Sequence, residues 1–369
     1  MNISFMAIRR TLKPGNIAVL GLLLARLSLS LADQKLPEDM HLWVLASIEN
    51  IYNEKFKQAE EEAKHIIKKY PEHPAGYFFF AAAIEAWMNY YQSSNREEDF
   101  YRCCDKAIET GERLLDKDPG NAWVKFFYGG ADGYKGTYES RYERWITSFR
   151  HGWKGVSALN EIKKADPEFH DVNYGIGMYN YWRSAMIKTL WWMPSVGDNS
   201  KEGIKQLIDA KNFGMYTRIS AAEHLIPILC NEKRFKEAMN ICDEMLERYP
   251  TTLVFYWGRG EAFLGLKRFE EAKHIYNYIL SRVEAEVRRD YQRESGMGHP
   301  EVPKLRGQDR GKRTRREIHE EDHEYEGGEE SPGQDIGGEG RAAFRRFTGS
   351  LLFIDIEEGH DQGGDEARD

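Results

Sequence analysis

The sequence predicts an all-α protein, an α-solenoid of about six helical hairpins with a disordered C-terminal tail. Three observations predict it. A short motif recurs along the chain, amphipathic stretches of helical period flank each copy, and prolines follow the second stretch at a constant distance. We therefore expect a helical repeat domain over residues 38–286 and a low-complexity tail over residues 287–369.

The first 32 residues have the layout of a secretory signal peptide. A basic start precedes an apolar run over residues 17–32, which Arg26 interrupts. Ser30 and Ala32 supply the small residues that signal peptidase reads, so we expect cleavage after Ala32 and export to the periplasm or cell envelope. The uninterrupted run is short for a membrane span, which needs ~20 apolar residues. An uncleaved anchor remains the alternative.

The repeated motif places an aromatic residue and a small residue three positions apart. It occurs at residues 54–59, 233–238 and 267–272. The aromatic residue fills the gap at the turn, and the alanine lets the two helices approach closely, where a leucine would overpack by about 1–3 kcal/mol. Twelve residues after the alanine, Pro71 and Pro250 end the second helix because proline lacks the amide that continues it.

This spacing divides the domain into six hairpins. The first helices are expected to start near Glu38, Pro74, Gly120, His170, Met215 and Thr251, and the second helices near Phe56, Arg96, Arg144, Asn199, Phe235 and Phe269. Hairpins one, five and six fit a period of 34 residues. Hairpins two to four are longer because their first helices are extended.

These features resemble the tetratricopeptide repeat (TPR) family, over about residues 37–286. The middle segment, with Tyr174–Trp182 and then Trp191-Trp192-Met193-Pro194, is similar to a group of exported bacterial TPR proteins of undefined activity. A fainter resemblance links it to a eukaryotic outer-mitochondrial-membrane repeat family that helps to clear protein inclusions. The resemblance implies a scaffold or adaptor, and it carries over no catalytic residue.

Aromatic and charged residues on the expected first helices are candidates for a concave ligand groove. Tyrosine and tryptophan suit such a groove because they combine a large apolar area with a polar tip. The candidates are Tyr128, Tyr134, Tyr138, Tyr179, Tyr181, Trp182, Arg183, Trp257 and Arg259. The competing and more frequent interpretation is packing inside the solenoid, which would also explain the glycines near Gly129 and Gly133.

The remaining signals are weaker. A net charge of −8 argues against nucleic-acid binding, which needs a basic face. Trp191 and Trp192 could make peripheral contact with a membrane interface, where tryptophan is favoured. The four cysteines have no CxxC spacing, so we interpret them as small core residues.

The tail contains one metalloprotease-like pattern. His319-Glu320-Glu321-Asp322-His323 matches HExxH, but charged residues flank it and no apolar helix face or third ligand follows. We interpret it as chance, and expect neither a metal nor another cofactor. Two explanations of the tail stay open: a genuine acidic appendage, or a frame-shifted reading of a gene that encodes further repeats.

Together these patterns predict an exported, non-enzymatic scaffold that binds a protein segment or an extended polymer in a concave groove. Two alternatives remain: a membrane-associated organiser of the cell envelope, and a zinc-dependent hydrolase that uses the tail motif.

Overall fold

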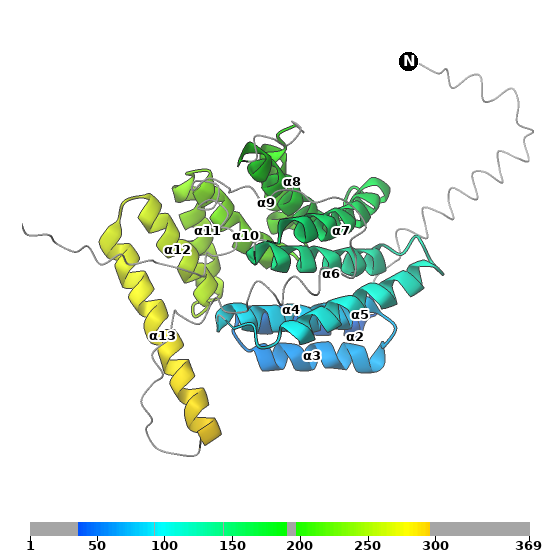
Figure 1. Cartoon of the computed structure of the whole chain (residues 1–369), viewed down its shortest axis with the longest axis horizontal. Helices are drawn as coiled ribbons and strands as arrows, with labels where there is room; N and C mark the ends of the chain where they lie inside the picture. Colours follow the sequence, from blue (N-terminus) through cyan, green and yellow to red (C-terminus); the bar gives the residue numbers. More distant parts are fainter. Residues whose placement is uncertain (1–35, 92, 143, 190–196, 296–369) are drawn as a thin grey trace, which may run out of the picture.

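The computed structural model describes residues 36–91, 93–142, 144–189 and 197–295. Within these ranges the protein has twelve helices and no strand, which confirms the predicted all-α solenoid of six hairpins (Figure 1). The helices are α2 (Glu38–Tyr52), α3 (Phe56–Lys69), α4 (Pro74–Tyr90), α5 (Glu97–Leu115), α6 (Ala122–Arg141), α7 (Trp145–Ala165), α8 (Val172–Thr189), α9 (Ser200–Phe213), α10 (Arg218–Asn231), α11 (Phe235–Arg248), α12 (Leu253–Gly265) and α13 (Phe269–Ser295). The predicted signal peptide, Trp191 and Trp192, and the tail from residue 296 lie outside the described residues.

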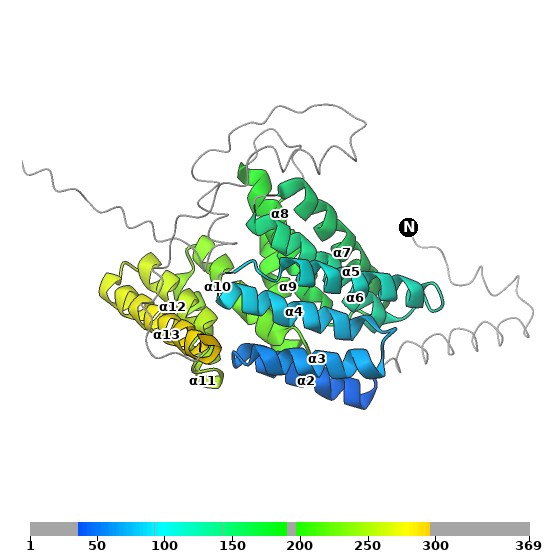
Figure 2. The ribbon, with the colours of Figure 1, turned by 60° about the horizontal axis from the view of Figure 1, so that its bottom comes forward.

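The helices pack in two layers. Each helix contacts the next along the chain, and α2, α4, α6, α8, α10 and α12 also contact one another in succession. These first helices of the hairpins form an inner layer, and the second helices cover it from outside, as in a repeat array whose units pack on their neighbours. Figure 2 shows the same succession from another side.

The predicted helix starts agree with the structure to within about three residues. Pro74 occupies the first turn of α4, and the side chain of Asn121 caps α6 by accepting the amide of Val124 at 3.0 Å. The last helix differs from the prediction, because α13 continues to Ser295 and not only to Glu286. The extra turns contain several Arg, Glu and Gln residues, which have good helix propensity.

Three hairpin turns share a left-handed residue. Glu54, Lys233 and Lys267 have φ values of 59°, 59° and 58°, and each precedes the motif's aromatic residue by two positions. Left-handed backbone costs a non-glycine residue about 1–2 kcal/mol. The motif therefore specifies a turn geometry as well as the helix contact behind it.

Pairs of glycines bring first and second helices into backbone contact. A Cβ added to Gly155 of α7 would lie 2.6 Å from the carbonyl oxygen of Gly129 in α6, and one added to Gly203 of α9 would lie 2.7 Å from that of Gly177 in α8. Helix packing therefore explains these glycines. Gly133 is different, because an added Cβ there would meet nothing within 4 Å.

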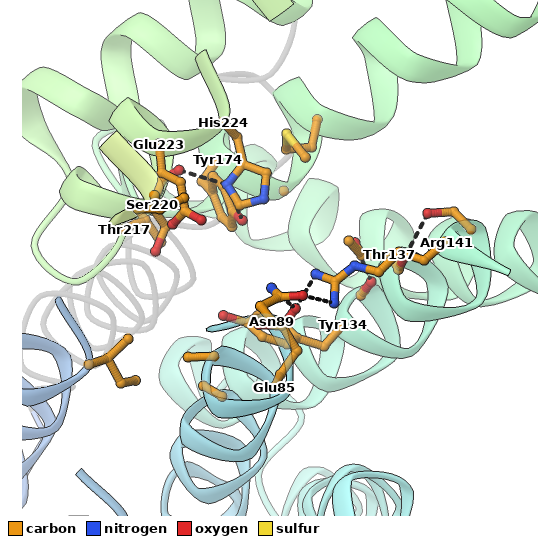
Figure 3. Close-up of a pocket in the computed structure, with 18 of the residues that line it drawn as sticks. Glu85, Asn89, Tyr134, Thr137, Arg141, Tyr174, Thr217, Ser220, Glu223 and His224 are labelled. Carbon is orange, nitrogen blue, oxygen red and sulfur yellow. Dashed lines mark hydrogen bonds and ion pairs between the residues drawn. The ribbon is translucent and has the colours of Figure 1, made fainter. Parts of the chain in front are cut away.

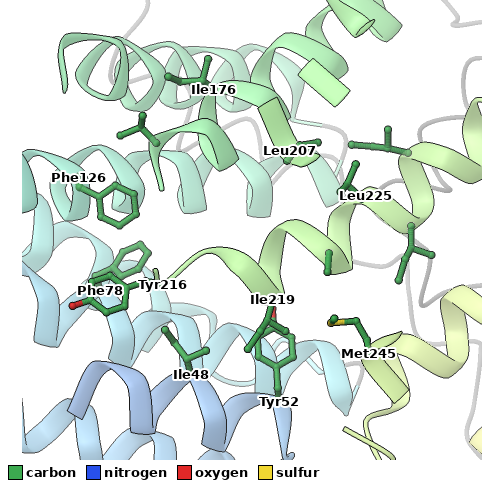
Figure 4. Close-up of a cluster of buried hydrophobic side chains, with 14 of the residues drawn as sticks. Ile48, Tyr52, Phe78, Phe126, Ile176, Leu207, Tyr216, Ile219, Leu225 and Met245 are labelled. Carbon is green, nitrogen blue, oxygen red and sulfur yellow. The ribbon is translucent and has the colours of Figure 1, made fainter. Parts of the chain in front are cut away.

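A continuous apolar core joins the hairpins. Ile48, Phe78, Phe126, Ile219 and Leu225 come from α2, α4, α6 and α10 and belong to one cluster of buried residues (Figure 4). All four cysteines are buried and free, as expected for core residues.

The first hairpin contacts the fifth and sixth. The Tyr52 backbone carbonyl accepts the Thr252 hydroxyl, and the Tyr249 hydroxyl donates to Glu49 at 3.0 Å. The Tyr52 ring also lies against Tyr249 and Phe255, with ring centroids 5.8 and 6.0 Å away. The sequence predicts an open concave groove, but these contacts close the array on itself. Its inner face becomes a cavity.

Candidate functional site

The first helices enclose a cavity of about 650 Å³. Helices α2, α4, α6, α8, α10 and α12 all contribute to its wall, and α7 and α13 complete it. A volume of this size is within the ~300–1,000 Å³ range of pockets that hold small ligands. Asn277 and Leu280 line it and are exposed, so the cavity opens to solvent beside α13.

The wall is largely apolar and aromatic. Phe78, Tyr134, Tyr174, Trp182 and Trp257 come from four of the first helices and face this space. Such residues provide a large contact area at a small cost in side-chain entropy, because each has only two rotatable side-chain bonds.

The first of two polar groups in the cavity combines α4 and α6. The Arg141 guanidinium donates to the carboxylate of Glu85 and to the amide oxygen of Asn89 (Figure 3). The Asn89 side-chain nitrogen in turn donates to Glu85 at 2.8 Å. The positive and negative charges in this group therefore compensate each other.

The second polar group combines α2 and α10. The Tyr52 hydroxyl lies 2.6 Å from Glu223 Oε2 and 3.0 Å from Ser220 Oγ. Because it has one hydrogen, it donates to the carboxylate and accepts from the serine. Glu223 Oε1 has no hydrogen-bond partner among the described residues.

His224 adjoins this second group. Its Nδ1 lies 2.9 Å from the carbonyl oxygen of Ser220, which can only accept, so Nδ1 carries a hydrogen. The Tyr174 hydroxyl is 3.3 Å from the same nitrogen. In the neutral ring the other nitrogen, Nε2, is then an acceptor. Figure 3 shows the His224 ring beside Tyr174 and Glu223.

Burial keeps the tyrosines of the cavity protonated. Desolvation is the largest cause that raises the pKa of Tyr52, Tyr134 and Tyr174, and the nearby carboxylate of Glu223 raises each further. These hydroxyls therefore remain hydrogen-bond donors at neutral pH. That of Tyr134 has no partner among the described residues, and Figure 3 shows this side chain beside Asn89 and Arg141.

Five of the nine groove candidates line the cavity. They are Tyr134, Tyr179, Trp182, Arg183 and Trp257. Arg183 is half-buried, and no carboxylate among the described residues lies within ion-pair distance of it.

The other four candidates pack elsewhere. The Tyr128 side chain lies against Gly111 of α5, and the Tyr138 ring packs 4.8 Å from that of Phe100. The Tyr181 hydroxyl donates to Glu232 at 2.9 Å, and Arg259 pairs with Asp243 at 3.0 Å. The groove candidates were predicted from their residue types alone. The helix face on which each residue lies decides whether its side chain lines the cavity.

Apart from Arg183, the charged residues of the cavity were not among the candidates. Glu85, Arg141, Glu223 and His224 all lie on first helices, and three of them interrupt otherwise apolar stretches: Ala81–Trp87 for Glu85, and Ile219–Leu229 for Glu223 and His224. A charged side chain within an apolar helix is the signal that could have identified them, because burying a charge is costly unless it has a partner or a role.

No match is found between this chain and models of known protein families, nor between it and curated proteins. The geometry of the cavity therefore has to carry the functional argument. None of the described helices is long and apolar enough to cross a membrane. Within the described ranges, no three His, Cys, Asp or Glu side chains gather closely enough to hold a metal ion.

Proposed function

We propose that this protein is an exported, TPR-like binding protein that holds a segment of another protein, or of an extended polymer, inside its coil of helical hairpins. The observation that carries the proposal is the aromatic cavity that the first helices enclose. Export is proposed from the basic start, apolar run and Ala32 cleavage site of the N-terminus.

The size of the cavity supports a segment as the ligand. About 650 Å³ accommodates a drug-sized group or a few side chains, and not a folded domain. The exposed positions of Asn277 and Leu280 give an extended ligand a route of entry beside α13.

The arrangement of polar groups in the cavity supports binding over catalysis. Arg141 is paired with Glu85, and Arg282 with Glu54 at 3.0 Å. No cysteine lines the cavity, and the Ser220 hydroxyl bonds to Tyr52 and not to a histidine, as far as the described residues extend. A nucleophile activated by a neighbouring base is therefore not part of the proposal.

Two other functions depend on segments outside the described residues. A membrane organiser would use the uncleaved N-terminus or Trp191 and Trp192, and sequencing of the mature protein decides the first, since a start at Asp33 excludes the anchor. A zinc hydrolase would use His319 and His323. Stoichiometric zinc that is lost in a His319→Ala variant would establish it.

The proposal is tested by comparing partner capture by the wild type with capture by a variant whose cavity is filled by a larger side chain. Gly133 lines the cavity and has open space at its Cβ, so the side chain of Gly133→Leu should project into the ligand's place. Ala165→Leu, on an exposed position of α7, is the matched control. We expect a photo-crosslinker at Tyr179 to capture an envelope partner in the wild type and the control, and not in Gly133→Leu. Equal capture by all three would refute a ligand in the cavity.

A further inference from the structure

We infer that the bound segment places a cationic group, a lysine or arginine side chain, beside Glu223 in the cavity. This inference rests on the proposed function and specifies the chemistry of its ligand. It is carried by the charge balance of the cavity wall, the free acceptors around Glu223 and the aromatic rings that surround them.

The charge balance singles out Glu223. The carboxylates of Glu54 and Glu85 each have an arginine partner. Glu223 lines the same cavity, yet no lysine, arginine or histidine of the described residues lies within ion-pair distance of it. A half-buried carboxylate without a cation is costly, and a cationic ligand would supply the missing partner.

The hydrogen bonds of Glu223 leave room for such a partner. The Tyr52 hydroxyl occupies only Oε2, at 2.6 Å, and orients the carboxylate. Glu223 Oε1 is an acceptor, and so is His224 Nε2 when the ring is neutral with its hydrogen on Nδ1. Figure 3 shows the two side chains adjacent on α10. An ammonium group has three donors and a guanidinium has five, so either can satisfy both acceptors. An anionic group would meet electrostatic repulsion from the Glu223 carboxylate.

The surrounding rings favour a cation as well. Tyr52, Tyr134 and Tyr174 line the cavity near Glu223. Aromatic faces attract a cation, more strongly when water is excluded, and they receive the apolar stem of a lysine or arginine side chain. The carboxylate and the aromatic surface therefore select the same chemical group.

The arginines of the cavity do not replace this cation. Arg141 belongs to the first polar group, where it donates hydrogen bonds to Glu85 and Asn89. Arg183 follows Tyr174 by nine residues on α8, which is about 13 Å of helix rise. It is free to pair with an anionic part of an extended ligand, whereas the position beside Glu223 remains open to a cation.

Three small probes test the inference directly. The compounds n-hexylammonium, hexan-1-ol and hexanoate share one tail and differ in head group, and Trp182 and Trp257 report binding by their fluorescence because they line the cavity. We expect the wild type to bind n-hexylammonium at least ten-fold more tightly than hexan-1-ol, with hexanoate the weakest. Glu223→Gln should reduce this preference to less than two-fold. Arg183→Gln should retain the preference.

The outcomes separate the inference from the proposed function. Equal affinity of the wild type for the ammonium and the alcohol would overturn the cation site and leave a ligand-binding cavity in place. If Gly133→Leu binds all probes as tightly as the wild type does, the cavity is not the ligand site. The same conclusion follows if the wild type binds none of the probes. The wild-type comparison needs no variant, so it stands even if Glu223→Gln does not fold. Replacing n-hexylammonium by n-hexylguanidinium distinguishes a lysine-like from an arginine-like ligand.

Discussion

The carboxylate of Glu54 accepts the backbone amide of Leu253 at 2.6 Å, although 199 residues separate them in the chain. The same carboxylate pairs with Arg282 of α13 at 3.0 Å. Units of a repeat array ordinarily contact only their neighbours, so this contact between the first and sixth hairpins changes the architecture. It joins the ends of the array and converts an inner groove into a cavity that opens to solvent beside α13.

We predict that Glu54→Gly destabilises the protein by about 2 kcal/mol, because it leaves the largely buried Leu253 amide without its acceptor and removes the carboxylate that pairs with Arg282. The measurement is the free energy of unfolding in urea. Lys267→Gly is the matched control, since Lys267 has the same left-handed backbone at the same turn position but an exposed side chain. Glycine relieves the backbone strain there, so the control should stabilise by up to about 1 kcal/mol. Equal effects of the two changes would show that Glu54 does not close the array.

The glycines of α6 and α7 should respond oppositely to alanine. Gly133→Ala should stabilise the protein by about 0.5–1 kcal/mol, because its Cβ meets open space and alanine has the better helix propensity. Gly155→Ala should destabilise it by about 1–3 kcal/mol, because its Cβ would lie 2.6 Å from the Gly129 carbonyl oxygen. Thermal unfolding of both variants measures the difference. A stabilising Gly155→Ala would contradict the close helix contact.

A half-buried histidine predicts a loss of stability in acid. Burial lowers the pKa of His73 from 6.5 to about 4, and its Nδ1 accepts the Ala75 amide at the start of α4, which requires the neutral ring. A lowered pKa means that the unfolded chain binds the proton first. The stabilisation is therefore complete above pH 6.5 and is lost as the pH falls towards 4, by a total of about 3 kcal/mol.

His73→Asn tests this prediction, because asparagine can still cap the helix but does not titrate. The difference in unfolding free energy between the wild type and the variant should be constant above pH 7 and should shift in favour of the variant between pH 6.5 and 4. Parallel pH profiles of the two proteins would exclude His73 as the cause.

The hairpins could be predicted from local sequence, whereas the closure of the array could not. An aromatic residue, an alanine and a later proline specify each turn and helix end, so Phe56, Phe235 and Phe269 marked three helix starts correctly. The contact of Glu54 with Leu253 depends on a small rotation per hairpin, summed over the whole array. No single motif specifies the accumulated rotation of the array, so the cavity that results from its closure could not be predicted.

The site could be predicted only in part for a related reason. The candidates were selected because they are aromatic or charged. Each residue of an α-helix is rotated by about 100° from the one before, so candidates close in sequence lie on different helix faces. On α12, Trp257 lines the cavity, and Arg259, two residues later, pairs with Asp243 of α11. The charged groups of the cavity were missed because Glu223 resembles any solvent-exposed glutamate until its neighbours in space are known.

This division on α12 gives the last prediction. Trp257→Leu should weaken the binding of n-hexylammonium at least three-fold, since it removes an aromatic part of the cavity wall. Arg259→Gln should leave binding unchanged. It should cost at most about 1 kcal/mol of stability, because its ion pair with Asp243 is partly exposed and such pairs contribute little. Titration of both variants, with circular dichroism as a check of folding, makes the comparison. Weaker binding in Arg259→Gln than in Trp257→Leu would place the ligand on the outer side of α12, and the enclosed cavity would then not be the binding site.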